Sequence, residues 1–266
     1  MQGSHATQTG CTGSVALWHH KLLDQRKIGT GRIFAVVIAG DTVTQTLWTA
    51  VDKYITDLLV PPDPALDAAL QASSAAGLPS IQVSPVQGKL LHLLARACGA
   101  RQVLEIGTLG GYSTIWLARA LPAGGHVVTL EADPKHAEVA RANFALAGLA
   151  GVIELRLGPA LETLPKLAAE GRGPFDLIFI DADKANMREY FEWAMKLSRA
   201  GSVIIADNVI RKGGVLDAAS GDADIQGVRH FNERLAAEKR VSATEIQTVG
   251  SKGYDGFALV LVNSDC

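Results

Sequence analysis

The chain has 266 residues, of which 48% are hydrophobic, 20% charged and 6% aromatic, and its formal net charge is −2. This length allows one substantial core, and the near-neutral charge with few aromatic residues argues against a nucleic-acid-binding surface. The longest uncharged apolar runs are too short to span a bilayer, so no membrane partner is expected.

The three cysteines, Cys11, Cys98 and Cys266, are scattered along the chain. They have neither the spacing of a disulfide framework nor that of a metal site, which is typical of a reducing compartment. The first residues also lack the charged and apolar regions of a secretory signal. We therefore expect a cytoplasmic location.

Residues 1–43 are expected to form an N-terminal extension, in which the first ten residues resemble an added leader or a disordered tail. A metal role for His19 and His20 is less favoured than a solvated segment, because adjacent helical positions point in different directions. The apolar run 36–40 is either an edge strand or a partner contact. Residues 44–266 are expected to form one domain.

Three helices are predicted at the start of this domain, at 44–59, 64–76 and 86–97. The first has apolar residues at helical spacing and stops before Pro61, and the second ends at Gly77. Ser84 is predicted to cap the third helix, with Pro85 at its first position. The remainder of the domain then follows a different pattern.

From residue 101 onward, strands and helices alternate, which indicates a mostly parallel sheet covered on both faces. Two final strands follow each other without a helix and are expected to form an antiparallel hairpin. The predicted strands are 101–106, 126–131, 152–157, 175–180, 202–206, 242–249 and 255–262. The predicted helices are 112–121, 134–147, 160–169, 186–198 and 223–238.

A glycine-rich turn follows the first of these strands, where Gly107, Gly110 and Gly111 allow the backbone to approach a ligand closely. The dinucleotide fingerprint fails, because its second and third glycine positions hold other residues. Glu131 ends the next strand at the distance where an acid would bind ribose hydroxyls. Acids without basic neighbours favour a cationic nucleoside over a pyrophosphate.

Acid and amide side chains follow two further strands, with Asp181, Asp183 and Lys184 after one strand and Asp207 and Asn208 after another. Because ligands bind at the carboxyl edge of an open α/β sheet, these groups are expected to converge. Two carboxylates and an amide oxygen suit Mg²⁺. The plainer alternative is that the acids cap loops or helices, and that Lys184 is a solvated lysine.

These motifs resemble those of the metal-dependent class I S-adenosylmethionine O-methyltransferases, which include the caffeoyl-coenzyme A and catechol enzymes. The resemblance covers roughly residues 44–262 and is most specific at 103–113, 158–161, 175–184 and 206–209. It implies a Rossmann-like, doubly wound α/β fold whose seven-stranded sheet has an antiparallel last strand. It also implies a homodimer.

The resemblance assigns roles to individual residues. It places Glu105, Gly107 and Ser113 at the methionine part of the cofactor, Glu131 at the ribose and Ala160 beside the adenine. The full cofactor set that it implies is Glu105, Gly107, Gly111, Ser113, Glu131, Ala160, Asp181 and Asp183. The metal set is Asp181, Asp207 and Asn208, and the catalytic pair is Lys184, as a general base, with Asp181.

Two positions depart from the plant members of this family. Val83 stands where they have a threonine near the metal, and Arg211 with Lys212 replaces a Trp-Asn pair, so these three residues are candidates for substrate contacts. Arg211 and Lys212 are either ordinary loop charges or groups that meet an acidic or phosphate-bearing substrate. Asp255 is expected to serve a turn rather than the pocket.

The expected function is therefore transfer of a methyl group from S-adenosylmethionine to a hydroxyl of a small catechol-type or polyphenolic molecule, with Mg²⁺, Mn²⁺ or Ca²⁺. Two alternatives stay open: a metal-independent methyltransferase, and a non-catalytic S-adenosylmethionine-binding protein. A nicotinamide dehydrogenase is the weakest reading, because the glycine fingerprint fails.

Overall fold

The computed structural model describes residues 44–264. The N-terminal extension, with His19, His20 and the run 36–40, lies outside the described residues. Within the described part, no helix is long and apolar enough to cross a membrane. The division of the chain at residue 43 stays a prediction.

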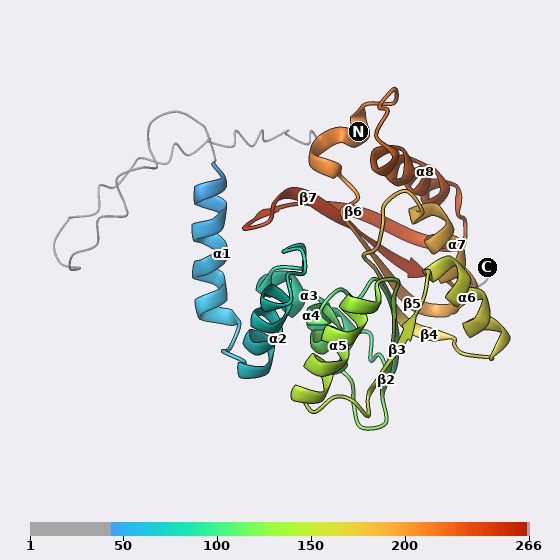
Figure 1. Ribbon diagram of the computed structural model, residues 1–266. Helices are drawn as coiled ribbons and strands as arrows, with labels where there is room; N and C mark the ends of the chain where they lie inside the picture. Colours follow the sequence, from blue (N-terminus) through green and yellow to red (C-terminus); the bar gives the residue numbers. More distant parts are fainter. Residues whose placement is uncertain (1–43, 265–266) are drawn as a thin grey trace, which may run out of the picture. The chain divides into compact units, whose positions relative to one another are not determined.

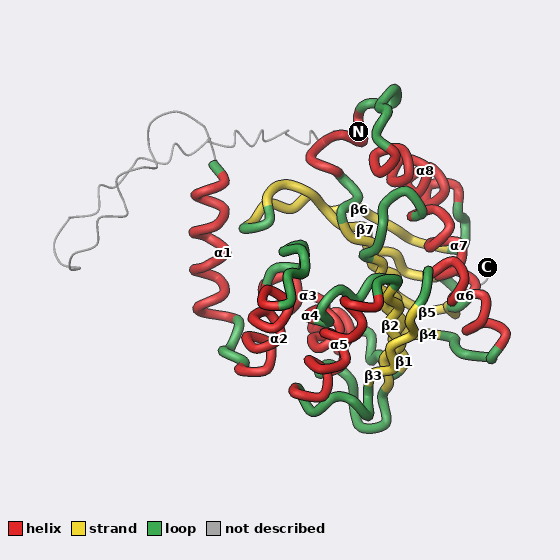
Figure 2. Tube along the Cα trace, in the orientation of Figure 1, coloured by secondary structure: helices red, strands yellow, loops and turns green. Residues whose placement is uncertain are grey.

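Seven strands form one sheet in the order β3-β2-β1-β4-β5-β7-β6 (Figures 1 and 2). Neighbouring strands from β3 to β5 are parallel, whereas β7 is antiparallel to both β5 and β6. The predicted sheet, with its C-terminal hairpin, is therefore confirmed. The strands are β1 Gln102–Ile106, β2 His126–Glu131, β3 Ile153–Leu157, β4 Phe175–Ile180, β5 Ser198–Asp207, β6 Val241–Gly250 and β7 Gly253–Val262.

Helices cover both faces of the sheet, as the alternation predicted. Alternate residues of one strand enter different cores: Val103 packs with α2–α5, whereas Leu104 and Ile106 pack with α6–α8. The helices are α1 Gln45–Leu59, α2 Pro64–Ala75, α3 Pro85–Ala97, α4 Tyr112–Ala118, α5 Pro134–Leu146, α6 Ala160–Ala169, α7 Met187–Lys196 and α8 Ala223–Ala237.

The predicted start of α3 is confirmed, since Ser84 caps the helix through Gln87 N and Pro85 is its first residue. The largest differences from the predictions are three. Helix α4 ends at Ala118, strand β5 already begins at Ser198, and an unpredicted 3-10 helix, η1, spans Arg211–Leu216. The early start of β5 arises because the Ser202 hydroxyl bonds to Phe175 O (2.7 Å) and so ties a polar turn to β4.

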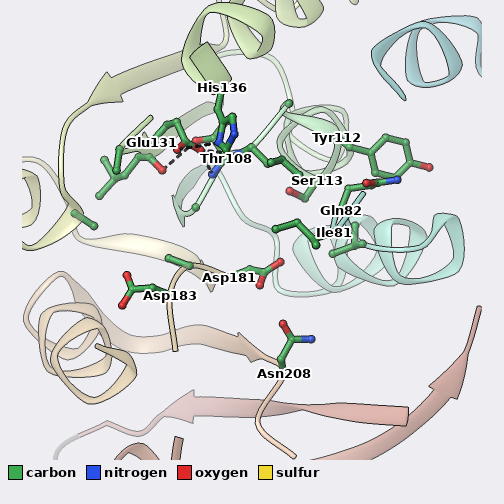
Figure 3. A pocket seen from close by; sticks show the side chains of 18 of the residues that line it. Ile81, Gln82, Thr108, Tyr112, Ser113, Glu131, His136, Asp181, Asp183 and Asn208 are labelled. Atoms are coloured by element: carbon green, nitrogen blue, oxygen red, sulfur yellow. Dashed lines mark hydrogen bonds and ion pairs between the residues drawn. The ribbon is translucent and has the colours of Figure 1, made fainter. Parts of the chain in front are cut away.

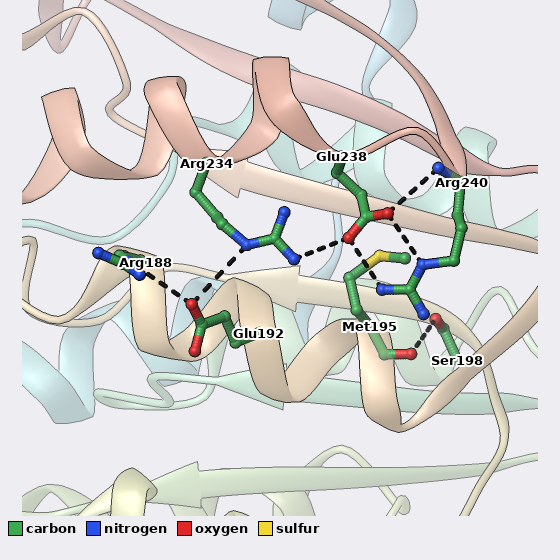
Figure 4. A network of polar contacts seen from close by, with 7 residues as sticks. All are labelled: Arg188, Glu192, Met195, Ser198, Arg234, Glu238 and Arg240. Carbon is green, nitrogen blue, oxygen red and sulfur yellow. Dashed lines mark hydrogen bonds and ion pairs between the residues drawn. The ribbon is translucent and has the colours of Figure 1, made fainter.

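Helices α7 and α8 are joined by a polar network on their outer side (Figure 4). The Arg234 guanidinium lies 3.7 Å from Glu192 on α7 and donates to Glu238 at 2.7 Å. Hydrogen bonds from Arg240 and Arg234 hold the pKa of Glu238 well below its ordinary value. This network fixes α8, whose first turn carries a residue of the functional site, Asp224.

Candidate active site

A cavity of about 590 Å³ opens at the carboxyl edge of the sheet, where β1, β2, β4 and β5 end. Glu131 and His136 lie at one end of it and Asn208 at the other, with Asp181 and Asp183 between them (Figure 3). The glycine turn and the acidic strand ends therefore share one pocket. This is the arrangement that the sequence motifs predicted.

The turn after β1 packs directly against the end of β4. Asp181 N donates to Ile106 O at 2.8 Å. Gly107 has φ +100°, and a Cβ added to it would lie 2.1 Å from the carbonyl oxygen of Asp181. Only glycine fits this close approach, which brings the turn beside the acidic residues.

Glu105 is fully buried and does not line the cavity. Its carboxylate accepts hydrogen bonds from Ser113 and Thr129 (both 2.6 Å) and from Thr114. Burial raises the pKa of this carboxyl to about 7, against the effect of the three hydroxyl donors. The direct contact that links Glu105 to the cavity wall is its bond to Ser113, and a second link runs through Thr129 to Thr108, which also lines the cavity.

Glu131 holds the other side of the turn. Its carboxylate accepts from Leu109 N (2.7 Å) and Thr108 N (3.3 Å), and it lies 3.5 Å from His136 Nδ1. A further bond comes from Asp133 N at the start of α5 (2.9 Å). The carboxylate thereby joins the ends of β1 and β2 and lines the cavity.

The acids after β4 and β5 form a second cluster. Lys184 is buried and donates to Asp181 Oδ1 at 2.8 Å. Asp207 is only 6% exposed and accepts from Gln87 Nε2 (2.7 Å) and Asn208 N (2.9 Å). Burial, and then repulsion by Asp181, raises the pKa of Asp207 to about 7. A positive charge placed between the two carboxylates would relieve this repulsion.

The donor set of this cluster fits a hard cation, because Asp181, Asp207 and Asn208 offer only oxygen atoms. Within residues 44–264, no group of three or more His, Cys, Asp and Glu side chains is placed to hold a metal. A cation here would therefore depend on the Asn208 amide as its third protein ligand. Asn208 has φ +60° and lines the cavity, whereas Asp207 does not line it.

The remaining predicted residues separate into two groups. Ala160, Asp183, Val83 and Arg211 line the cavity. Gly111 and Lys212 do not. Gly111 is instead the N-cap of α4, where an added Cβ would meet the Phe144 ring at 2.3 Å.

Several residues at the site were not predicted from the sequence. Tyr190 donates to Asp183, and burial together with this bond raises the pKa of the tyrosine. Gln87 contacts Asp207 from α3, 120 positions away in the sequence. Of these residues, only His136 could have been identified from its position in the sequence, since it lies five residues after Glu131, in the first turn of the next helix. Asp255 serves a turn as predicted, accepting from Ile210 N (3.0 Å) and Arg211 N (2.9 Å).

The chain is similar in sequence to known O-methyltransferases. The sequence profile of the O-methyltransferase family matches residues 63–261. A catechol O-methyltransferase of Niastella koreensis is 55% identical over 216 residues, which cover 81% of this chain and 98% of that protein. A catechol O-methyltransferase of Mycobacterium tuberculosis is 58% identical over 212 residues, covering 80% of this chain and 94% of that one.

Solved structures agree with these relatives. An O-methyltransferase from Bacillus cereus in complex with SAH has a TM-score of 0.82 and 58% identity, covering 83% of this chain and 100% of that one. An O-methyltransferase of Streptomyces achromogenes in complex with SAM, involved in tomaymycin synthesis, has a TM-score of 0.81 and 52% identity. It covers 84% of this chain and 100% of that one.

Proposed function

Because this chain belongs to the family of S-adenosylmethionine-dependent O-methyltransferases, we propose that its acceptor is a small catechol-type or polyphenolic molecule and that the reaction requires Mg²⁺. The observation that carries the proposal is the shared cavity. The glycine turn after β1 lines the same pocket as Asp181 after β4 and Asn208 after β5, with Gly107 against Asp181. Relatives named catechol O-methyltransferase support the acceptor class.

The cofactor would lie along the turn. We propose that Ser113, oriented by buried Glu105, faces its methionine part, and that Glu131 binds the ribose hydroxyls. To accept the ribose, the Glu131 carboxylate would exchange part of its present bonding to Leu109 N and Thr108 N. Ala160 lies at the start of α6 and would border the adenine. Bound S-adenosylmethionine supplies an electrophilic methyl group.

Asp181, Asp207 and Asn208 would hold the cation, with Mn²⁺ or Ca²⁺ as possible replacements for Mg²⁺. A bound divalent cation stabilises the deprotonated form of a hydroxyl that it contacts. Lys184 has its Nζ atom 2.8 Å from Asp181 and lines the same cavity, so we propose that Lys184, in its neutral amine form, accepts the proton that leaves the acceptor hydroxyl. The protein's main contribution is to hold the two reactants in line, which is worth roughly 7–11 kcal/mol.

The decisive experiment combines a chelator with one substitution. EDTA is expected to abolish methyl transfer from S-adenosylmethionine to a dihydroxybenzene, and added Mg²⁺ to restore it. Asp207→Ala should lower kcat/KM at least about 100-fold and weaken Mn²⁺ binding, measured by electron paramagnetic resonance. Asp57→Ala removes an exposed carboxylate of α1 and is the matched control. Full turnover by Asp207→Ala would contradict the proposal.

A metal-independent reaction is the second candidate, and one observation favours it. Lys184 already neutralises the charge of Asp181, and the Asp207 carboxylate already accepts two hydrogen bonds without a cation. In that case the acids serve to position Lys184. Methyl transfer that persists in EDTA would select this candidate, and cofactor binding without any methyl transfer would select a non-catalytic role.

We also propose that the protein is a homodimer. Helix α1 buries none of its residues and exposes Tyr54 and Leu58, while Ile246 and Val249 are exposed on the nearby β6. Such apolar side chains are typical of surfaces that contact a second subunit. The cytoplasmic location and the absence of nucleic-acid or membrane partners stay predictions.

A further inference from the structure

The segment after Asn208 presents a positive charge to the cavity in a fixed conformation. Arg211 and Lys212 have φ +51° and +55°, a region that side-chain-bearing residues adopt at a cost in free energy. The Asp255 carboxylate holds the segment by accepting from the backbone N of both Ile210 (3.0 Å) and Arg211 (2.9 Å). This fold-back leaves Arg211 on the cavity wall and Lys212 off it.

The Arg211 guanidinium is only partly satisfied. Its Nη2 atom donates to Asp224 at 3.1 Å, but its buried Nε–H has no acceptor. A guanidinium carries five N–H donors, so this single bond leaves most of them available. The Asp224 side chain is 42% exposed, and an ion pair at such a site contributes little. Unsatisfied buried donors are rare in proteins and point to a partner.

The charges around the cavity define what this partner is. Of the described lysine and arginine residues, only Lys184 and Arg211 line it, and Lys184 is engaged by Asp181. Arg211 is therefore the cation that has donors to spare. Four acids, Glu131, Asp181, Asp183 and Asp224, line the same space and would repel a dianionic phosphate. A planar carboxylate carries a single charge and matches the guanidinium fork.

We propose that Arg211 binds a carboxylate on the phenolic acceptor, so that the preferred substrates are catechols with an acidic side chain. This proposal rests on the proposed function. Asn208, one of the proposed metal ligands, lies three residues before Arg211 on the same segment. Both residues line the same cavity, so an acceptor whose hydroxyls lie beside Asn208 can bring a carboxylate substituent to the guanidinium.

The test compares two acceptors that differ only in charge, 3,4-dihydroxybenzoate and its methyl ester. The wild-type enzyme is expected to prefer the acid about 10- to 100-fold in kcat/KM, mainly through KM, which is the usual effect of a hydrogen bond to a charged group. Arg211→Gln should abolish this preference while it retains activity on the ester. Arg211→Lys keeps the charge and should keep part of the preference.

Lys212→Gln is the matched control, because it removes the adjacent charge from the same left-handed segment but not from the cavity wall. It should keep the wild-type preference. Equal kcat/KM for acid and ester in the wild type, or an equal loss on both acceptors in Arg211→Gln, would overturn the proposal.

If neither acceptor is methylated, the proposed function fails but the role of Arg211 can still be decided. Calorimetric titration of each compound into the SAH-bound protein gives its dissociation constant. The ratio of the two constants then measures the preference for the acid over the ester. Tighter binding of the acid that Arg211→Gln removes supports the carboxylate contact. Equal dissociation constants for the two compounds refute it.

Discussion

Glu105 places a carboxylate on strand β1 in a position that water does not reach. The hydroxyls of Ser113, Thr114 and Thr129 surround it and replace part of the lost hydration. They do not compensate fully, since the pKa of this group rises from its ordinary value of 4.5 to about 7. Glu105 therefore lowers the stability of the fold whenever it is ionised.

We expect the difference in stability between Glu105→Gln and the wild type to shift in favour of the variant as the pH rises, because the wild type loses stability. Below pH 4.5 the wild-type carboxyl is protonated in both states and costs nothing. Between pH 4.5 and 7 the carboxyl ionises in the unfolded chain before it does so in the folded protein, so the stability of the wild type falls. Above pH 7 it is ionised in both states, and the loss in unfolding free energy is constant at on the order of 3 kcal/mol. The measurement is the difference in Tm between variant and wild type at pH 5 and pH 8. A difference that does not change with pH would contradict this account.

Individual residues also mark the limit of what the sequence could predict. The pattern of acids after the strands was sufficient to predict that Asp181 and Asn208 share a pocket, because parallel strands end at one edge. It could not separate Arg211 from Lys212, since the choice depends on a backbone turn held by Asp255 from another strand. Nor could it show that Glu105 stays off the cavity wall and is linked to it through hydroxyl side chains such as that of Ser113.

At the scale of elements, the contact between the β1 turn and the end of β4 decides whether the site exists. Gly107→Ala would place a methyl group 2.1 Å from a backbone oxygen, which cannot move as a flexible side chain can. We expect a loss of at least about 3 kcal/mol in unfolding free energy, from the clash and the positive φ together. Urea unfolding and SAH titration measure the effect, and affinity for SAH should fall at least about tenfold.

Gly99→Ala is the control for that experiment. Gly99 also has a positive φ, +65°, but a Cβ added there meets no atom within 4 Å. Gly99→Ala should lower the unfolding free energy by about 1 kcal/mol and leave the affinity for SAH unchanged. Equal losses in the two variants would mean that the close approach to Asp181 contributes nothing.

Elements with a clear period were predictable, whereas irregular ones were not. The β-α alternation located the five strands from β1 to β5, because buried parallel strands are apolar and are separated by helices of typical length. The last two strands were located as a hairpin, because they follow each other without a helix. The start of β5 was missed because residues 198–201 carry no large apolar side chain, and their pairing depends on contacts with Phe175 on β4. Helix η1 was missed because three consecutive residues, at 211–213, have positive φ angles. The first two, Arg211 and Lys212, are not glycines, so nothing in the sequence signals this backbone conformation.

At the scale of the whole molecule, α1 is held to the domain mainly by polar contacts. Gln45 donates to Gly250 O (2.9 Å), and Asp52 accepts from Ser251 N (2.7 Å) at the tip of the β6–β7 hairpin. Several of its apolar side chains stay exposed, including Tyr54 at 65% and Leu58 at 63%. A helix with an apolar face and no buried residue gains little stability from the domain alone. A second copy of the chain would cover this face.

Substitution of one exposed leucine tests this role. Leu58→Glu is expected to shift the wild-type dimer toward monomer in light scattering coupled to size-exclusion chromatography, because a charge placed in an apolar interface loses its hydration. Leu146→Glu is the matched control, since Leu146 lies on α5, is also 63% exposed and is distant in sequence from α1 and β6. It should leave the mass at twice that of one chain. A monomeric wild type, or equal dissociation by both variants, would show that α1 does not mediate self-association, and its exposed face would then need another partner.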